Sequence, residues 1–113
     1  MKHIKAIIRP EMLDSIREAL KVIGCYRGVT ISEVLGHGNQ KGIEQVWRGE
    51  KYHKDLLEKV MLDMIVKDEE VAIIKKAIIE SVRTGEHGDG KIFVYDVQEA
   101  IRIRTGDEGE SAL

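Results

Sequence analysis

Residues 60–95 read VMLDMIVKDEEVAIIKKAIIESVRTGEHGDGKIFVY, and this stretch predicts a strand, a helix and a second strand. Apolar residues alternate with others from Val60 to Val66, as in a strand with one buried face. Residues at helical spacing then form an apolar stripe: Val71, Ile74, Ile78 and Val82. Gly85 lies beyond the end of that stripe, and residues 91–95 are β-prone. The stretch therefore predicts one β-α-β unit.

A similar unit occupies the first part of the chain. Residues 3–9 alternate like a strand, Pro10 lies where a helix can begin, and Gly24 lies where that helix should end. Residues 29–35 predict a second strand, and residues 100–104 predict a last one. Two such halves predict an α+β domain, a ferredoxin-like split β-α-β sandwich with both helices on one face of an antiparallel sheet. We expect self-association to cover the other face.

Composition places residues 1–113 in a single globular domain. Hydrophobic residues make up 42% and charged residues 34%, a balance that argues against disorder. The net charge of −2 gives no reason to expect nucleic acid as a partner. Apolar runs are too short to span a bilayer and no signal peptide opens the chain, so we expect a cytoplasmic protein. The single cysteine, Cys25, fits a reducing compartment and lacks a partner for nucleophilic catalysis.

A long connection joins the two halves. Residues 36–56 show no periodicity and carry several glycines among polar residues. Connections of this length in a small domain are usually functional or disordered, so both a binding loop and a tolerated insertion remain open. Trp47 and Arg48 are residue types favoured as interface anchors, and the hydroxyl of Tyr52 could be reached by an enzyme.

The segment TGEHGDGK, residues 84–91, joins the predicted second helix to a strand. Its glycines let backbone N–H groups face an anion, and Lys91 adds a positive charge. On the predicted last strand, Arg102 and Arg104 would share a face. Three cations converging on this turn would suit a polyphosphate, whereas a plain tight turn and two solvated arginines are the alternative. The segment lacks the Ser/Thr and the helix of a Walker loop.

Residues 1–113 resemble the PII signal transduction family, the nitrogen-regulatory proteins. The segments that carry the resemblance are TGEHGDGKIFV (84–94), IRIRTG (101–106) and WRGEKY (47–52). The long connection and the order of strands and helices agree with it. The resemblance implies a compact homotrimer that signals and is not an enzyme. It also implies a flexible T-loop at about residues 37–56 and a C-terminal loop at about residues 105–113.

The resemblance further implies that ATP or ADP binds in clefts between subunits. The implied nucleotide-binding residues are Thr30, Gly38, Asn39, Gln40, Ile65, Gly88, Asp89, Gly90, Lys91, Arg102 and Arg104. In this arrangement the turn residues 88–91 hold the phosphates from one side, and Arg102 and Arg104 reach the phosphates from the neighbouring subunit. Thr30 and Ile65 lie near the adenine. Gln40 completes a magnesium shell when 2-oxoglutarate binds, and Lys59 pairs with a carboxylate of that ligand.

The T-loop implied by the resemblance selects the partner, an ammonium transporter or an enzyme of nitrogen metabolism. Arg48 matches the arginine that enters a transporter pore, which would bring the protein to a membrane. Tyr52 matches the tyrosine that is uridylylated in enteric-type relatives. Three positions depart from the family pattern: Trp47 replaces a tyrosine, Glu50 replaces a small residue, and Asn39 replaces an arginine that contacts the nucleotide.

Two other functions remain open. Asn39 motivates a divergent PII-like sensor with a different small-molecule effector. A small ferredoxin-like enzyme acting on phosphate esters or acyl phosphates would use Asn39, Arg102 and Arg104, although the turn offers no nucleophile or base. The histidines (His3, His37, His53 and His87) are scattered without metal-ligand spacing, so we expect no metal site built from them.

Overall fold

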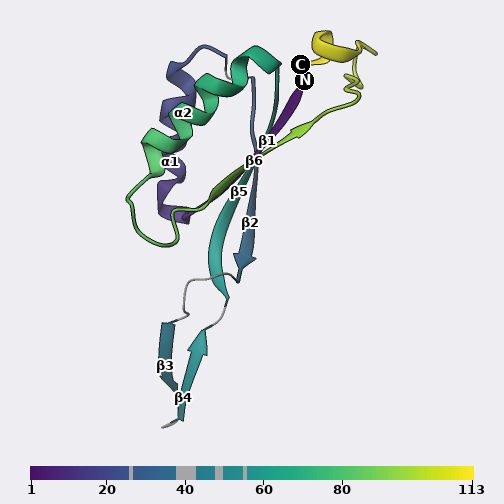
Figure 1. Ribbon diagram of the computed structural model, residues 1–113. Coiled ribbons are helices and arrows are strands. Elements are labelled where there is room, and N and C mark those ends of the chain that lie inside the picture. The colour runs from purple at the N-terminus through teal and green to yellow at the C-terminus, as the bar shows by residue number, and fades with distance from the viewer. Residues whose placement is uncertain (26, 38–42, 48–49, 55) are drawn as a thin grey trace.

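The computed structural model describes residues 1–25, 27–37, 43–47, 50–54 and 56–113 (Figure 1). A four-stranded antiparallel sheet has the order β2-β5-β1-β6. Its strands are β1 (Lys2–Ile8), β2 (Thr30–Gly36), β5 (Leu57–Val66) and β6 (Lys91–Asp96). Helices α1 (Leu13–Val22) and α2 (Val71–Val82) cover one face of this sheet (Figure 1). The predicted α+β, ferredoxin-like arrangement is confirmed.

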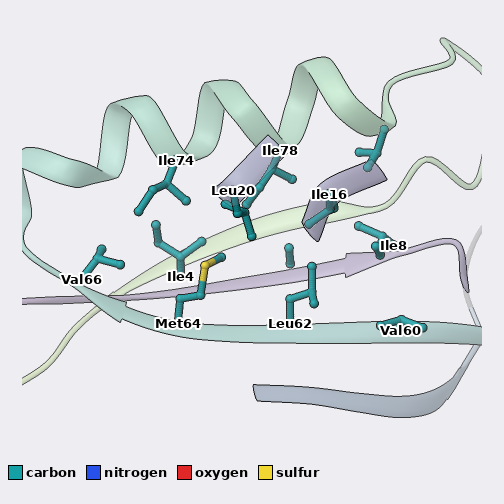
Figure 2. Packing of buried hydrophobic residues seen from close by; sticks show 12 residues of the cluster. Ile4, Ile8, Ile16, Leu20, Val60, Leu62, Met64, Val66, Ile74 and Ile78 are labelled. Carbon is teal, nitrogen blue, oxygen red and sulfur yellow. The ribbon is translucent and has the colours of Figure 1, made fainter. Parts of the chain in front are cut away.

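The core lies between the two helices and the two central strands. Ile4, Ala6 and Ile8 of β1 are paired with Met64, Leu62 and Val60 of β5, and all six side chains are buried. Figure 2 shows the larger of these strand side chains beneath those of the helices, with Ile4, Ile8, Val60, Leu62 and Met64 below Ile16, Leu20, Ile74 and Ile78. Alternate strand residues therefore point to the opposite face, which no helix in the described part of the chain covers.

Short 3-10 turns precede both helices. The first turn, Pro10–Met12, begins at the predicted proline, and Gly24 follows α1 with φ +73°, as a helix-ending glycine does. The second turn, Asp68–Glu70, is fixed by Glu70, whose carboxylate accepts a hydrogen bond from the Lys67 backbone N–H at 2.9 Å. Glu70 also accepts hydrogen bonds from the Arg27 guanidinium, which holds the pKa of this buried carboxyl below its usual range.

The connection between the two halves is more regular than its sequence predicted. It contains a hairpin of β3 (Ile43–Trp47) and β4 (Glu50–Lys54), in which Trp47 is opposite Glu50. The sequence of residues 36–56, which shows no periodicity, therefore did not predict these two strands. Among the described residues, the two strands pair with each other and not with the main sheet. An isolated hairpin needs no buried face, so the hydrophobic alternation that marks other strands is absent.

The predicted strand at residues 100–104 is also wrong. Ile101 forms only a single bridge with Glu108, and the chain turns back at once. The Arg102 N–H donates to the Asp107 carbonyl at 2.9 Å, and the Gly106 N–H donates to the Arg102 carbonyl at 2.7 Å. A 3-10 turn, Gly109–Ala112, follows. In the part of the chain that is described, no helix has the length and apolar character needed to cross a membrane.

Candidate functional site

The glycine-rich turn between α2 and β6 packs tightly against β1. Gly85, Gly88 and Gly90 all have positive φ values, +86°, +96° and +103°. A Cβ atom on Gly90 would lie 1.8 Å from the carbonyl oxygen of Ile7, so a larger residue would force the turn away from the sheet. Glycine at this position therefore brings the turn close to the end of β1.

Asp89 lies at the centre of the turn. Its carboxylate accepts hydrogen bonds from the Thr84 hydroxyl (2.5 Å), the Thr84 N–H (2.8 Å) and the Gly85 N–H (2.9 Å). These bonds, with the Thr84 hydroxyl contributing most, hold the pKa of Asp89 well below its usual range. The carboxylate thus orders the turn from inside, whereas sequence reasoning placed Asp89 among the residues that hold phosphate.

Arg9 is a site residue that sequence reasoning missed. Its Nη1 lies 2.6 Å from Oδ1 of Asp89, and its Nη2 donates to the His87 carbonyl at 2.6 Å. A weaker bond of 3.3 Å joins Nη1 to the Thr84 hydroxyl. Arg9 directly follows β1, and the pairing of Ile7 with Lys91 places this end of β1 beside the turn. The strand register was the signal that could have identified it.

A hollow of about 480 Å³ opens beside the turn. The residues that line it are Ile7, Gly36, His37, Leu57, Lys59, His87, Gly88, Gly90, Lys91 and Phe93. It therefore brings together four predicted site residues from β5, the turn and β6, at the place where the long connection leaves β2. Lys59 Nζ donates to the Gly88 carbonyl at 3.2 Å. Two ammonium groups beside a glycine-rich backbone can bind an anion with several negative charges.

Two other predicted residues lie farther along the uncovered face. Thr30 pairs with Asp63, and Ile65 is on the same side of β5 as Lys59. Six residues of strand separate Lys59 from Ile65, about 20 Å. Neither Thr30 nor Ile65 is among the residues that line the hollow. Both could contact only a part of a ligand that extends away from it.

Arg102 and Arg104 do not approach the turn within one chain. β6 leads away from the turn, and the Val97 N–H donates to the Met1 carbonyl at 3.2 Å, so the C-terminal segment lies beside the N-terminus (Figure 1). There Arg102 pairs with Asp107 at 3.2 Å, and Arg104 is exposed. The three cations therefore do not converge on the turn within a single chain, and the resemblance places the two arginines on the neighbouring subunit.

The remaining predictions fall on the long connection. Gly38, Asn39, Gln40 and Arg48 lie outside the described residues. Trp47 is in β3 and Tyr52 is in β4, where Tyr52 is opposite Gln45. The roles expected for these residues stay predictions. Among the described residues, no group of three or more His, Cys, Asp or Glu side chains is arranged to hold a metal ion.

Comparison with known proteins gives a consistent result. Residues 1–107 match the family Nitrogen regulatory protein P-II. The chain is 53% identical to the nitrogen regulatory protein P-II of Haemophilus influenzae and 50% identical to that of Pasteurella multocida, in each case over the whole of both chains. It is 47% identical to the nitrogen regulatory protein P-II 2 of Methanothermobacter thermautotrophicus, over all of this chain and 97% of that one. The chain therefore belongs to the nitrogen regulatory protein P-II family.

Proposed function

We propose that this P-II protein is a trimeric sensor that binds ATP or ADP, together with 2-oxoglutarate and magnesium, and regulates a nitrogen-metabolism target through its T-loop. The observation that carries the proposal is the hollow at the root of the T-loop, where Lys59 and Lys91 meet the glycine-rich turn. A ligand bound there touches both the rigid sheet and the start of the connection. Its charge can therefore change which T-loop conformation is favoured.

The turn is suited to the phosphates of a nucleotide. Asp89 and Arg9 already hold it in shape, so little ordering is needed when an anion binds. Lys91 and backbone N–H groups can then donate charge-assisted hydrogen bonds, which contribute about 1.5–3 kcal/mol each. Three or four such bonds account for much of the roughly 8 kcal/mol that micromolar affinity requires.

A neighbouring subunit would complete the site. Arg102 and Arg104 lie at the far end of β6 in one chain, so they can reach a phosphate at the turn only from another chain. The uncovered sheet face exposes large side chains, with Phe93 41%, Tyr95 47% and Ile65 36% exposed. Packing three such faces together would bury them, and a closed trimer uses the same surface on every subunit.

A doubly charged keto acid fits beside the nucleotide. Lys59 donates only to the Gly88 carbonyl at 3.2 Å in the described contacts, a neutral acceptor that a carboxylate would displace. The described lining of the hollow contains no carboxylate, the side chain that most often binds magnesium in proteins. Magnesium would therefore take its ligands from Gln40, the phosphates and the keto acid, and it would neutralise the charge that brings these anions together.

Calorimetry tests the proposal directly. ATP should bind the full chain, and 2-oxoglutarate with magnesium should tighten that binding. Lys91→Ala should abolish it, whereas Lys76→Ala, which removes a lysine 74% exposed on α2, should leave it unchanged. Unchanged ATP binding in Lys91→Ala would refute the phosphate site, and a lack of linkage between the ligands would refute the 2-oxoglutarate site. Sedimentation of a stable monomer would refute the trimer.

The target would be recognised by the T-loop. Trp47 is the last residue of β3 and Tyr52 lies on β4, while Arg48 follows Trp47 in the sequence. A pull-down with and without ATP plus 2-oxoglutarate separates the two partner classes: an ammonium transporter recovered from membranes, or a metabolic enzyme recovered from the soluble fraction. Loss of both on Trp47→Ala, with nucleotide binding retained, is the result expected for a partner-binding loop.

A further inference from the structure

Two histidines that are far apart in the sequence line the same hollow. His37 directly follows β2 at the root of the T-loop, and His87 belongs to the glycine-rich turn. Both side chains are exposed rather than packed in the core. The spacing of the histidines in the sequence does not predict that His37 and His87 lie close together. Their proximity depends on the antiparallel pairing of β2, β5, β1 and β6. The structure therefore places two imidazoles beside Lys59 and Lys91.

The charges around these imidazoles are mostly positive. Lys59 reaches the hollow from β5 and Lys91 from β6, while the Arg9 guanidinium donates to the His87 carbonyl at 2.6 Å. The nearby carboxylates are directed elsewhere or exposed. Glu58 is on the helix-covered side of β5, Asp89 is held by Thr84, Gly85 and Arg9, and Glu86 is an exposed neighbour of His87 in the turn.

We infer that His37 and His87 are two further anion-binding groups, which bind phosphate oxygens in their protonated form and make nucleotide affinity rise as the pH falls. The inference rests on the proposed nucleotide site. Histidine is the residue type whose unperturbed charge change lies between about pH 5 and 8, so it is the side chain that suits a pH-dependent anion site. No carboxylate is among the described residues that line the hollow, so a polyphosphate is the partner that would satisfy two added positive charges.

Linkage fixes the sign of the effect. A bound anion favours the protonated imidazoles, so binding takes up protons. The histidines therefore add their full share of nucleotide affinity at pH values below the pKa of the imidazoles in the free protein. This gain in affinity is lost as the pH rises above the pKa of the imidazoles in the nucleotide complex. Lys59 and Lys91 supply the affinity that remains at high pH.

The test is calorimetric titration of ADP into the full chain at pH 7.8 and pH 6.0. Protonation of the ADP phosphates is common to every variant, so the informative quantity is the change in affinity relative to the double variant His37→Gln/His87→Gln. The wild type should gain roughly tenfold more affinity than the double variant between these pH values. Equal changes in the two proteins would overturn the inference. His3→Gln, which removes a histidine of the sheet that does not line the hollow, should behave as the wild type does.

Nuclear magnetic resonance of the imidazoles gives a second readout that needs no double variant. Saturating ADP should raise the titration midpoints of two imidazoles in the wild type, and the single variants His37→Gln and His87→Gln should each remove one of them. Unmoved midpoints in a protein that binds ADP would overturn the inference and leave the proposed function intact. Absence of ADP binding at both pH values would instead overturn the proposed function, and the inference with it.

Discussion

The guanidinium of Arg9 and the carboxylate of Asp89 meet at 2.6 Å and join the end of β1 to the turn that precedes β6. Both side chains are mostly enclosed, 18% and 22% exposed. The other Arg9 terminal nitrogen holds the His87 carbonyl, so one side chain fixes two points of the turn. The shape of the candidate phosphate site is therefore set partly by a residue outside the glycine-rich motif.

Replacing Arg9 should weaken nucleotide binding without removing any phosphate contact. Arg9→Gln removes the ion pair to Asp89 and cannot hold Asp89 and the His87 carbonyl in the same geometry. The turn must then become ordered when ADP binds, which costs affinity. We expect ADP affinity to fall roughly tenfold, with Arg9→Lys in between because it keeps the charge. Calorimetry measures this, with Arg17→Gln, an exposed residue of α1, as the matched control. Wild-type affinity in Arg9→Gln would show that the turn holds its shape unaided.

Asp89 should stabilise the protein in a pH-dependent way. Its pKa is lowered in the folded state from the ordinary value of 3.8, mainly by the hydrogen bond from the Thr84 hydroxyl. A lowered folded pKa gives stability that is fully present above the ordinary range and is lost as the pH falls towards the folded value. Denaturant unfolding should therefore show a constant gap between wild type and Asp89→Asn above about pH 5, which narrows below about pH 4. A gap that widens towards acid would contradict this assignment.

The glycines of the turn should differ sharply in their tolerance of alanine. Gly85 and Gly90 both have positive φ, so alanine is strained at either position by about 1–2 kcal/mol. At Gly85 a Cβ atom meets nothing within 4 Å, whereas at Gly90 it meets the Ile7 carbonyl oxygen at 1.8 Å. Gly90→Ala should therefore lower the free energy of unfolding by much more than Gly85→Ala does. Gly90→Ala should also impair ADP binding. Equal effects of the two variants on both quantities would argue against the close approach of the turn to β1.

The parts of the fold that the sequence predicts are those with one buried face. Apolar residues recur at a period of two in β5 and of about 3.6 in α2. The predicted stripe matches α2, whereas β5 begins three residues before the predicted strand, at Leu57. The β3–β4 hairpin and the segment after β6 lack such a pattern. Their shape depends instead on local hydrogen bonds, such as that from the Arg102 N–H to the Asp107 carbonyl.

The site was predictable to the extent that its residues form a local motif. The turn and Lys91 could be recognised from residues 84–91 alone. Arg9, His37 and His87 could not be placed there, because their proximity follows from strand register rather than from spacing in the sequence. The same limitation explains the error on Arg102, since the direction in which β6 leaves the turn decides where that residue lies.

A core substitution should test the packing of the central strands. Leu62 is fully buried on β5 opposite Ala6, so Leu62→Ala leaves a cavity between the sheet and the helices. It should lower the free energy of unfolding by about 2–5 kcal/mol. Val22→Ala, at a position of α1 that is 83% exposed, should change it by less than about 0.5 kcal/mol. Denaturant unfolding compares the two, and a loss at Leu62 as small as that at Val22 would contradict the observed core.

Mixed trimers should show that the nucleotide site is shared between chains. Lys91→Ala removes the contribution of the turn, and Arg102→Ala/Arg104→Ala removes that of the other end of the chain, so neither variant alone should bind ADP tightly. After the two are dissociated and reassembled together, each mixed ring should contain an interface at which an intact turn faces intact arginines. Calorimetry should then recover a fraction of the wild-type sites. A mixture of Lys91→Ala with Gly90→Ala should recover none, because both substitutions damage the turn. Failure of the first mixture to bind better than the second, with mixed trimers verified by native mass spectrometry, would place the arginines outside the site.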